Sequence, residues 1–462
     1  MKQYDVITLG AGAAALTAIT SLNGTGLKCA IVEEDKPGGE CTYYGCVPTK
    51  TILSITEALG RIKEYKDLFS TEDQKIIHNL YPDYRKITQY KRTVVDRFSK
   101  KGSWEPFISS GIDVYNKHAT FISAHELKID DEVIWGKYII IATGAHPRIP
   151  EIPGLRQTDY LTHVEALELM EKPKSIAIVG AGAIGMEFAQ FFADMGVKTT
   201  VIQRSDHILS KEDPEMADVV EEHMKSLGVT FIKNATVQSV RSVYSNKKSL
   251  HVVFGSHEQE VLVEHLLVSI GMLPRTEGIG LEKAGVKLDA FANVDIDDTM
   301  KTSVDHIYSC GDVTGKYLFT HFAEYQANII AYNIQNPDNP LHISERVIPW
   351  ATYTDPPLAR VGLIERDARK RYGDDLLVAR LDFSDVERAR MMRAEKGRIK
   401  ILVKKSDGLM VGATIVGPWA DGIIHECVLA MQMNIHIQDV FNMIHIYPTL
   451  SEGIKWTLGK VL

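Results

Sequence analysis

The amino-acid sequence predicts an α/β fold with two doubly wound, Rossmann-like units and a smaller α+β domain in the last third of the chain. Two segments, 6–15 and 176–185, predict the doubly wound units, because each reads as an apolar strand, a glycine-rich turn and an alanine-rich helix. Alternating apolar residues at 399–403 and 412–416 are typical of antiparallel strands and predict the α+β domain.

The length and charge of the chain set the first limits on function. A chain of 462 residues is long enough for about three domains. The net charge of −8 is spread without long runs, so we expect neither nucleic acid nor a membrane surface as a partner. The first strand begins at Tyr4 with no signal-peptide pattern before it, and no apolar run reaches the ~18 residues that a transmembrane helix needs. We therefore expect a cytoplasmic protein.

The first glycine-rich turn has the spacing of a dinucleotide-binding site. Gly10 permits the tight turn, Gly12 lets the backbone approach a pyrophosphate, and Ala15 stands where the helix packs on the strand. The helix presents its N-terminal N–H groups to the phosphates. Glu33, after the next strand (29–32), can accept hydrogen bonds from both ribose hydroxyls. The segment predicts a bound dinucleotide; a tight turn without a ligand is the alternative.

The second turn contains all three glycines, Gly180, Gly182 and Gly185, and predicts a second dinucleotide site. Gln203 occupies the position that the acidic residue has after the first turn. A carboxylate there would repel a 2′-phosphate, and Arg204 can pair with that phosphate, so we expect NADPH in preference to NADH. The alternative is a solvated Arg204 beside an NADH ribose bound by Gln203. Two dinucleotide sites in one chain indicate FAD together with a nicotinamide dinucleotide.

Two of the five cysteines predict a redox centre, and the odd, low count argues against a secreted disulfide framework. The other three are expected to be buried small side chains: Cys29, Cys310 and Cys427. Cys41 and Cys46 are close in sequence, and Gly45 permits the bend that a disulfide between them needs. Pro48 suits a first helical turn, so Cys46 would lie at a helix N-terminus, which favours a thiolate, with Lys50 one turn later. Two unpaired buried cysteines are the alternative.

The stretch 38–50 resembles the GGxCxxxGCxPxK active site of the flavin-dependent pyridine nucleotide–disulfide oxidoreductases. This family includes dihydrolipoamide dehydrogenase, glutathione reductase and mercuric reductase. The resemblance covers essentially the whole chain, because three further family motifs follow in order. They are an ATG motif at 142–144, a second FAD motif at 308–313, and the segment 354–362 that opens the dimerisation domain.

The resemblance implies a role for each of these residues. Cys46 would be the flavin-proximal thiolate, and Cys41 the thiol that attacks the acceptor. Lys50 would pair with Glu187 near the flavin. Electrons would pass from NADPH or NADH through FAD to the disulfide, and then to a disulfide or thiol-reactive acceptor. Further implied FAD contacts are Gly39, Ala119, Thr143, Gly144, Asp312 and Ala323, and Gly271 is implied for the nicotinamide dinucleotide.

The chain departs from the family at the C-terminal His-Pro-Thr-x-x-Glu motif, where Tyr447 replaces histidine and Glu452 is kept. Histidine titrates near pH ~6.5 and tyrosine near ~10, so an unshifted Tyr447 is a poor base. His445 is a possible substitute, and a structural histidine is the alternative. Mercuric reductases also carry tyrosine here, but their C-terminal cysteine pair is absent from this sequence. A metal-ion or quinone reductase and a slow-turnover redox-sensing flavoprotein therefore stay open as alternative functions.

Linker-like breaks and the resemblance together predict four segments and a homodimer. Residues 1–150 would form the first part of the FAD-binding domain, and 151–271 the NAD(P)-binding domain. Residues 272–340 would complete the FAD-binding domain, and 341–462 would form the dimerisation domain. The dimer is expected because the family's active site takes its C-terminal motif from the partner chain.

Overall fold

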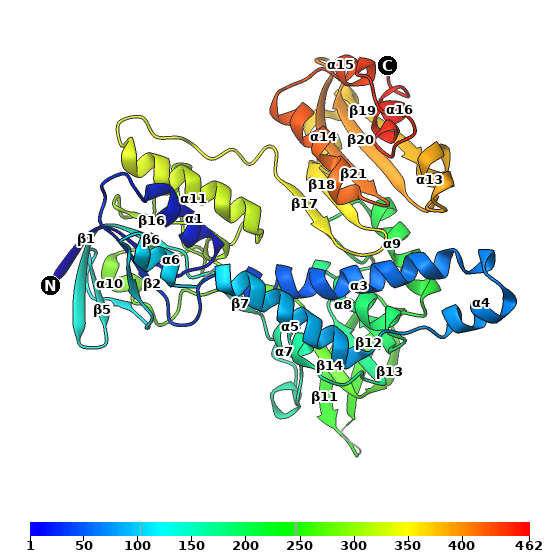
Figure 1. The fold of residues 1–462 in the computed structure, drawn as a ribbon, viewed down its shortest axis with the longest axis horizontal. Helices are drawn as coiled ribbons and strands as arrows, with labels where there is room; N and C mark the ends of the chain where they lie inside the picture. Colours follow the sequence, from blue (N-terminus) through cyan, green and yellow to red (C-terminus); the bar gives the residue numbers. More distant parts are fainter. Residues whose placement is uncertain (102, 245–246) are drawn as a thin grey trace. The chain divides into compact units, whose positions relative to one another are not determined.

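The structure, a computed structural model, describes residues 1–101, 103–244 and 247–462. The chain divides into two compact units, each built from three separate stretches. Unit 1 contains residues 1–49, 89–148 and 271–344. Unit 2 contains residues 50–88, 149–270 and 345–462. Figure 1 shows the elements of both units along the chain.

Unit 1 is built on a seven-stranded sheet. Its parallel strands are β1 (Lys2–Leu9), β2 (Cys29–Val32), β3 (Asp113–Tyr115), β6 (Glu132–Ile141) and β16 (Ile307–Ser309). Two antiparallel strands, β4 (Thr120–Phe121) and β5 (Glu126–Ile129), extend the sheet beyond β6. A separate antiparallel pair is formed by β7 (Ala145–Pro147) and β15 (Met272–Pro274). The first strand–helix–strand prediction is confirmed, since Val6 pairs in parallel with Cys29.

The helices of unit 1 follow from small and apolar residues near the ends of the strands. They are α1 (Ala13–Leu22), α2 (Gly39–Tyr43), α6 (Glu105–Ser109), α10 (Leu281–Ala284) and α11 (Thr320–Gln335). The alanines of α1 are buried and let α11 lie directly beside it (Figure 1). The two helices share one apolar core with the sheet, which fixes the first turn of α11 at the ends of the strands.

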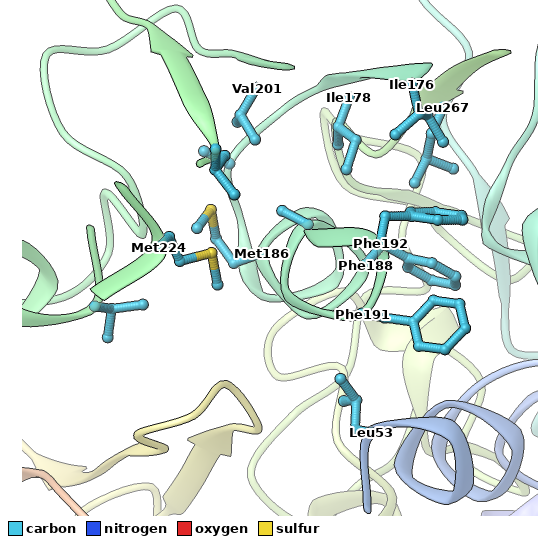
Figure 2. Packing of buried hydrophobic residues seen from close by; sticks show 14 of the residues in the cluster. Leu53, Ile176, Ile178, Met186, Phe188, Phe191, Phe192, Val201, Met224 and Leu267 are labelled. Carbon is cyan, nitrogen blue, oxygen red and sulfur yellow. The ribbon is translucent and has the colours of Figure 1, made fainter. Parts of the chain in front are cut away.

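Unit 2 contains a second parallel sheet, in the order β10–β9–β8–β14. Its strands are β8 (Ser175–Val179), β9 (Lys198–Ile202), β10 (Thr230–Ile232) and β14 (His265–Val268). Helix α8 (Ala183–Asp194) follows the second glycine-rich turn and is buried over most of its length. Figure 2 shows its phenylalanines 188, 191 and 192 in one cluster with the strand residues and with Leu53. This packing fixes α8 between the sheet and α3 (Cys46–Glu64).

The rest of the second doubly wound unit consists of helices and a small antiparallel sheet. Its helices are α4 (Thr71–His78), α5 (Tyr84–Lys101, which continues into unit 1), α7 (His163–Glu168) and α9 (Pro214–Ser226). Three antiparallel strands form a small sheet: β11 (Ala235–Ser242), β12 (Lys248–Phe254) and β13 (His257–Val263).

The last part of unit 2 is a five-stranded antiparallel sheet covered by helices. Its strands are β17 (Pro349–Thr352), β18 (Leu358–Gly362), β19 (Leu376–Asp382), β20 (Arg398–Lys404) and β21 (Leu409–Val416). Its helices are α12 (Glu365–Tyr372), α13 (Glu387–Met391), α14 (Ala420–Gln432), α15 (Ile437–Asn442) and α16 (Glu452–Leu458). The strands expected at 399–403 and 412–416 are therefore confirmed as an antiparallel pair.

The fold class expected from the sequence is confirmed: two parallel, doubly wound sheets precede an antiparallel α+β part. None of the helices in the described part of the chain is long and apolar enough to cross a bilayer. The four predicted segments remain a prediction, and the structure by itself divides the chain after residues 49, 88, 148, 270 and 344.

Candidate active site

The glycine-rich turn of unit 1 has the shape that a pyrophosphate needs. A Cβ on Gly10, which has φ +110°, would lie 2.3 Å from the carbonyl oxygen of Ala142, so only glycine fits there. A Cβ on Gly12 would meet nothing within 4 Å, so this backbone faces open space. Gly39, at φ +58°, approaches Gly12 so closely that a Cβ would lie 2.8 Å from its Cα atom. The three glycines leave bare backbone for a phosphate group to approach.

Two carboxylates of unit 1 fit the hydroxyl groups of FAD. Glu33 accepts hydrogen bonds from the backbone N–H groups of Ala11 (2.8 Å) and Asp35 (2.9 Å), which hold it against the turn. Burial, and then the charges of Glu40 and Cys46, raise the pKa of Asp312 to about 6. Within the described residues no hydrogen-bond donor reaches the Asp312 carboxylate. A buried carboxylate without donors suits a ligand that brings hydroxyl groups.

The remaining predicted FAD residues lie in the same unit. Thr143 donates its hydroxyl hydrogen to the carbonyl of Arg275 at 2.6 Å, and Gly144 has φ +74° with open space at its Cβ position. Ala119 is buried just before β4. Ala323 is buried in the first turn of α11, and a Cβ on Gly311 would lie 3.7 Å from the Cβ atom of Ala323. These residues all belong to unit 1, and their contacts with FAD remain predictions.

The second turn, in unit 2, repeats this geometry with a tighter helix contact. A Cβ on Gly180 would lie 2.4 Å from the carbonyl oxygen of Ser269, and a Cβ on Gly182 would meet nothing within 4 Å. A Cβ on Gly185 would lie 2.1 Å from the carbonyl oxygen of Gly180, so the third glycine is required here. The first turn tolerates Ala15 at that position, where the side chain is fully buried. Both turns therefore fit a dinucleotide.

Gln203 accepts the same backbone hydrogen bond in the second turn that Glu33 accepts in the first. Its Oε1 atom accepts from the N–H of Ala181 at 3.1 Å, and its Nε2 atom donates to the hydroxyl of Ser205 and the carbonyl of His207. Arg204 is exposed and has no ion pair with any described residue. Gly271, predicted for the nicotinamide side, belongs to unit 1, where its carbonyl accepts from Arg148 N–H at 2.9 Å.

The predicted cysteine pair spans the break between two helices. Cys41 lies in α2, and Cys46 is the first residue of α3. The chain turns at Gly45, whose N–H donates to the carbonyl of Glu40 at 2.7 Å. Both cysteines are half-buried, and neither is in a disulfide. The hydrogen bond from Cys41 to Cys46, and then burial, hold the pKa of the Cys41 thiol well above its usual range.

Thr320 is a contact of this pair that sequence reasoning missed. Its Oγ1 atom lies 3.5 Å from the Sγ atom of Cys46, across 274 residues of sequence. Thr320 is also the first residue of α11. The one sequence signal for it is a hydroxyl residue a few positions after the second FAD motif.

The Lys50–Glu187 pair implied by the resemblance is present in unit 2. The Nζ atom of Lys50 donates to both carboxylate oxygens of Glu187, at 2.7 and 3.0 Å. Glu187 also accepts from the backbone N–H of Tyr353 at 3.0 Å, and Lys50 lies 4.8 Å above the Tyr353 ring. The Tyr353 contacts were not predicted. The Glu187 side chain is only 4% exposed, against 36% for Lys50, so this carboxylate depends on its donors.

The two candidate proton carriers near the C-terminal motif, Tyr447 and His445, differ in burial. Tyr447 is 64% exposed. Its hydroxyl bonds the carboxylate of Glu387, which, with Glu452 further away, raises the pKa of the phenol. Glu452 accepts from the N–H of Thr449 at 3.1 Å. The side chain of His445 is 4% exposed and lies between the Glu426 carboxylate and the carbonyl of Met443, both at 3.1 Å. His445 therefore has the contacts of a structural histidine.

The other three cysteines are buried, as the sequence predicts. Burial raises the pKa of Cys29 to about 11 and that of Cys310 to about 12, so both stay protonated. Among the described residues no group of three or more histidine, cysteine or acidic side chains has the geometry to hold a metal ion. The Cys41–Cys46 pair is thus the candidate redox centre.

Two family models match the chain. The model described as pyridine nucleotide-disulphide oxidoreductase matches residues 4–327. The model described as the dimerisation domain of such oxidoreductases matches residues 348–458.

Similar proteins and solved structures span nearly the whole chain. A mercuric reductase of Staphylococcus aureus is 32% identical over 454 residues, which are 98% of this chain and 81% of that protein. A dihydrolipoyl dehydrogenase of Chlamydia muridarum is also 32% identical, over 98% of this chain and 95% of that protein. The Cu(II) complex of the HOCl-induced flavoprotein disulfide reductase RclA from Escherichia coli has a TM-score of 0.89 and 27% identity, with full coverage of both chains.

Proposed function

Because the chain belongs to the pyridine nucleotide-disulphide oxidoreductase family, we propose that it is a flavoprotein reductase with Cys41 and Cys46 as its redox pair. Electrons would pass from NADPH to a disulfide between these residues and then to a disulfide or other thiol-reactive acceptor. The observation that supports this best is the hydrogen-bonded pair of thiols at the start of α3, in the same unit as the first glycine-rich turn. When bound, FAD would supply the two-electron relay between the nicotinamide and the disulfide.

The residues of unit 1 are proposed to hold FAD. Gly10, Gly12 and Gly39 would let the pyrophosphate approach the backbone, and the start of α1 would offer its N–H groups. Glu33 would bind the ribose, and Asp312 would accept hydrogen bonds from the ribityl chain. In unit 2, Lys50 and Glu187 would orient one another, with the Tyr353 backbone as a third point of attachment.

NADPH is the proposed electron donor. The Gln203 side chain brings no negative charge to the end of β9, and its Nε2 atom already donates within the turn. Arg204 is exposed without an ion pair among the described residues, so its guanidinium is available to a 2′-phosphate.

For a disulfide acceptor, each bond change can be assigned to the cysteines. The Cys41 sulfur would attack one acceptor sulfur, the acceptor S–S bond would break, and the leaving thiolate would take up a proton. The Cys46 sulfur would then attack Cys41, restoring the disulfide between them and releasing the second product thiol. The first step needs Cys41 to lose its proton, although its pKa is raised. Tyr447 is a poor base for this step, because the Glu387 carboxylate raises the pKa of its phenol above the ordinary tyrosine value.

A second candidate acceptor is a thiophilic metal ion, which would be a substrate and not a resident cofactor. The observation that favours it is the Tyr447 hydroxyl bonded to Glu387, because a metal ion accepts electrons without needing an acid to protonate a leaving thiolate. Mercuric reductases are among the similar proteins, and a solved structure of a similar reductase is a Cu(II) complex.

A homodimer is proposed as the working assembly. The dimerisation-domain model covers residues 348–458, and exposed apolar side chains gather in the segment before the C-terminal motif. Ile444 is 95% exposed and Ile446 is 79% exposed, which a partner chain would cover. Ile446→Glu is expected to shift the protein from dimer to monomer in analytical ultracentrifugation. A wild-type protein that is already monomeric at micromolar concentration would contradict the proposal.

Steady-state turnover with NADPH tests the proposed function. The acceptors are lipoamide, glutathione disulfide, Hg(II), Cu(II) and a quinone, each with wild type, Cys41→Ser and Tyr447→His. Turnover that Cys41→Ser abolishes supports the redox pair, whereas equal turnover of that variant contradicts it. A gain of ~10²-fold or more with the disulfides in Tyr447→His would identify residue 447 as the missing base. Rapid flavin reduction without turnover on any acceptor would favour a redox-sensing flavoprotein.

A further inference from the structure

Thr320 places a hydroxyl group directly beside the sulfur of Cys46. The Oγ1 and Sγ atoms lie 3.5 Å apart, within reach of a hydrogen bond to sulfur. The Thr320 hydroxyl also reaches the Cys41 thiol, where its hydrogen bond favours the thiolate and opposes the larger effect of Cys46. One hydroxyl is therefore placed to donate its single hydrogen to either sulfur of the pair.

The surroundings of Cys46 make such a donor important. Cys46 begins α3 and Thr320 begins α11, so two helix N-termini meet at this sulfur, and neither first turn contains an acidic residue. Asp312 lies close enough to Cys46 for their negative charges to interact, since Cys46, like Glu40, raises the pKa of Asp312. Whether negative charge stays on Cys46 depends on the donors that face it.

Thr320 is not the N-cap residue of α11. The N-cap position is Phe319, whose side chain makes no capping hydrogen bond. Valine has nearly the shape of threonine, so loss of the hydroxyl can be separated from loss of packing.

We propose that the Thr320 hydroxyl donates a hydrogen bond to the Cys46 thiolate and so stabilises the negative charge that Cys46 carries in the reduced pair. Thr320 is thus a positioning residue that acts through Cys46. The inference rests on the proposed function, because it takes Cys46 as the thiolate of the reduced enzyme.

The test uses the FAD-loaded protein in a Cys41→Ser background, where Cys46 is the remaining sulfur of the pair. The variants are Thr320→Val, Thr320→Ser and, as a matched control, Thr71→Val. Thr71 is likewise the first residue of a helix, α4, but it is exposed and belongs to unit 2. The long-wavelength thiolate–flavin absorbance is titrated against pH, and the pH midpoint of alkylation of Cys46 by iodoacetamide is measured by mass spectrometry.

Thr320→Val is expected to raise both midpoints by about one pH unit, a tenfold loss of thiolate relative to thiol. Thr320→Ser should restore the parent midpoints, and Thr71→Val should leave them unchanged. In protein that keeps Cys41, the same tenfold change would make the disulfide potential about 30 mV more negative in Thr320→Val.

Midpoints that stay within ~0.2 pH units of the parent in Thr320→Val would overturn the proposal, as would a shift that Thr320→Ser does not reverse. Absence of the absorbance band from the parent variant would instead overturn the proposed flavin–thiolate arrangement. The alkylation midpoints would then still decide whether Thr320 stabilises the Cys46 thiolate.

Discussion

Replacing Lys50 with methionine tests how strongly the buried Glu187 carboxylate depends on its ion pair. The variant removes the donor at 2.7 and 3.0 Å from the two carboxylate oxygens and leaves the backbone N–H of Tyr353 in place as a donor to Glu187. Breaking a buried ion pair typically costs ~3–5 kcal/mol. Because Lys50 is 36% exposed and water reaches its ammonium group, we expect a smaller loss of ~2 kcal/mol in Lys50→Met.

A double-mutant cycle separates the ion pair from the packing of each side chain. In Glu187→Gln, the amide oxygen can still accept from Tyr353 and the Lys50 ammonium can turn to water, so we expect a loss of ~1 kcal/mol. The double variant is expected to lose little more than this, which gives a coupling energy of ~1–2 kcal/mol. Guanidinium unfolding followed by tryptophan fluorescence measures all four proteins.

A coupling energy under ~0.5 kcal/mol would refute this reasoning, because it would make the pair equivalent to a surface ion pair. Lys50→Arg is a useful control, since it keeps the charge but cannot keep the same single-point contact. Loss of stability in Lys50→Met together with an unchanged Lys50→Arg would assign the effect to charge alone.

Three further outcomes follow from the charges and contacts of the site. Glu387→Gln is expected to lower the pKa of Tyr447, because it removes the carboxylate that raises that pKa. The Tyr447 titration is isolated by subtracting the tyrosinate absorbance of the same protein carrying Tyr447→Phe, and a titration unchanged by Glu387→Gln would contradict the contact. Burial, and then nearby carboxylates, raise the pKa of Asp355 to about 7, so the folded protein keeps a proton that the unfolded chain releases above about pH 4. Stability should therefore fall as the pH rises from about 4 to about 7, and Asp355→Asn should flatten that part of the profile in thermal unfolding, whereas an unaltered slope would contradict the raised pKa. Arg204→Ala is expected to raise the KM for NADPH by ~10-fold or more and leave the KM for NADH unchanged, and equal effects on both would contradict the proposed phosphate contact.

Elements whose geometry is decided by neighbouring residues could be predicted from the sequence. Gly10 and Gly180 are needed because a side chain at either would collide with the backbone that follows β6 or β14, and the strand–glycine turn–helix pattern signals that requirement within a few residues. The helix start at Cys46 was predictable for the same reason, since Gly45 and Pro48 are local signals.

Contacts between distant segments could not be predicted in this way. Thr320 meets Cys46 because α11 packs beside α1 at the strand ends, and no periodicity near residue 320 encodes that meeting. The Tyr353 N–H reaches Glu187 across 166 residues for a similar reason. His445 and Tyr447 are two residues apart in sequence, yet only packing against Glu426 and Glu387 decides which is buried and which is exposed.

The most direct test of the proposed redox pair is to count thiols during anaerobic titration of the oxidised, FAD-loaded protein with NADPH. The account predicts that two new thiols become reactive as the first two electrons enter, and that mass spectrometry after alkylation assigns them to Cys41 and Cys46. Cys41→Ser should accept electrons without producing new thiols. Reduction of the flavin in wild-type protein with an unchanged thiol count would contradict the central claim.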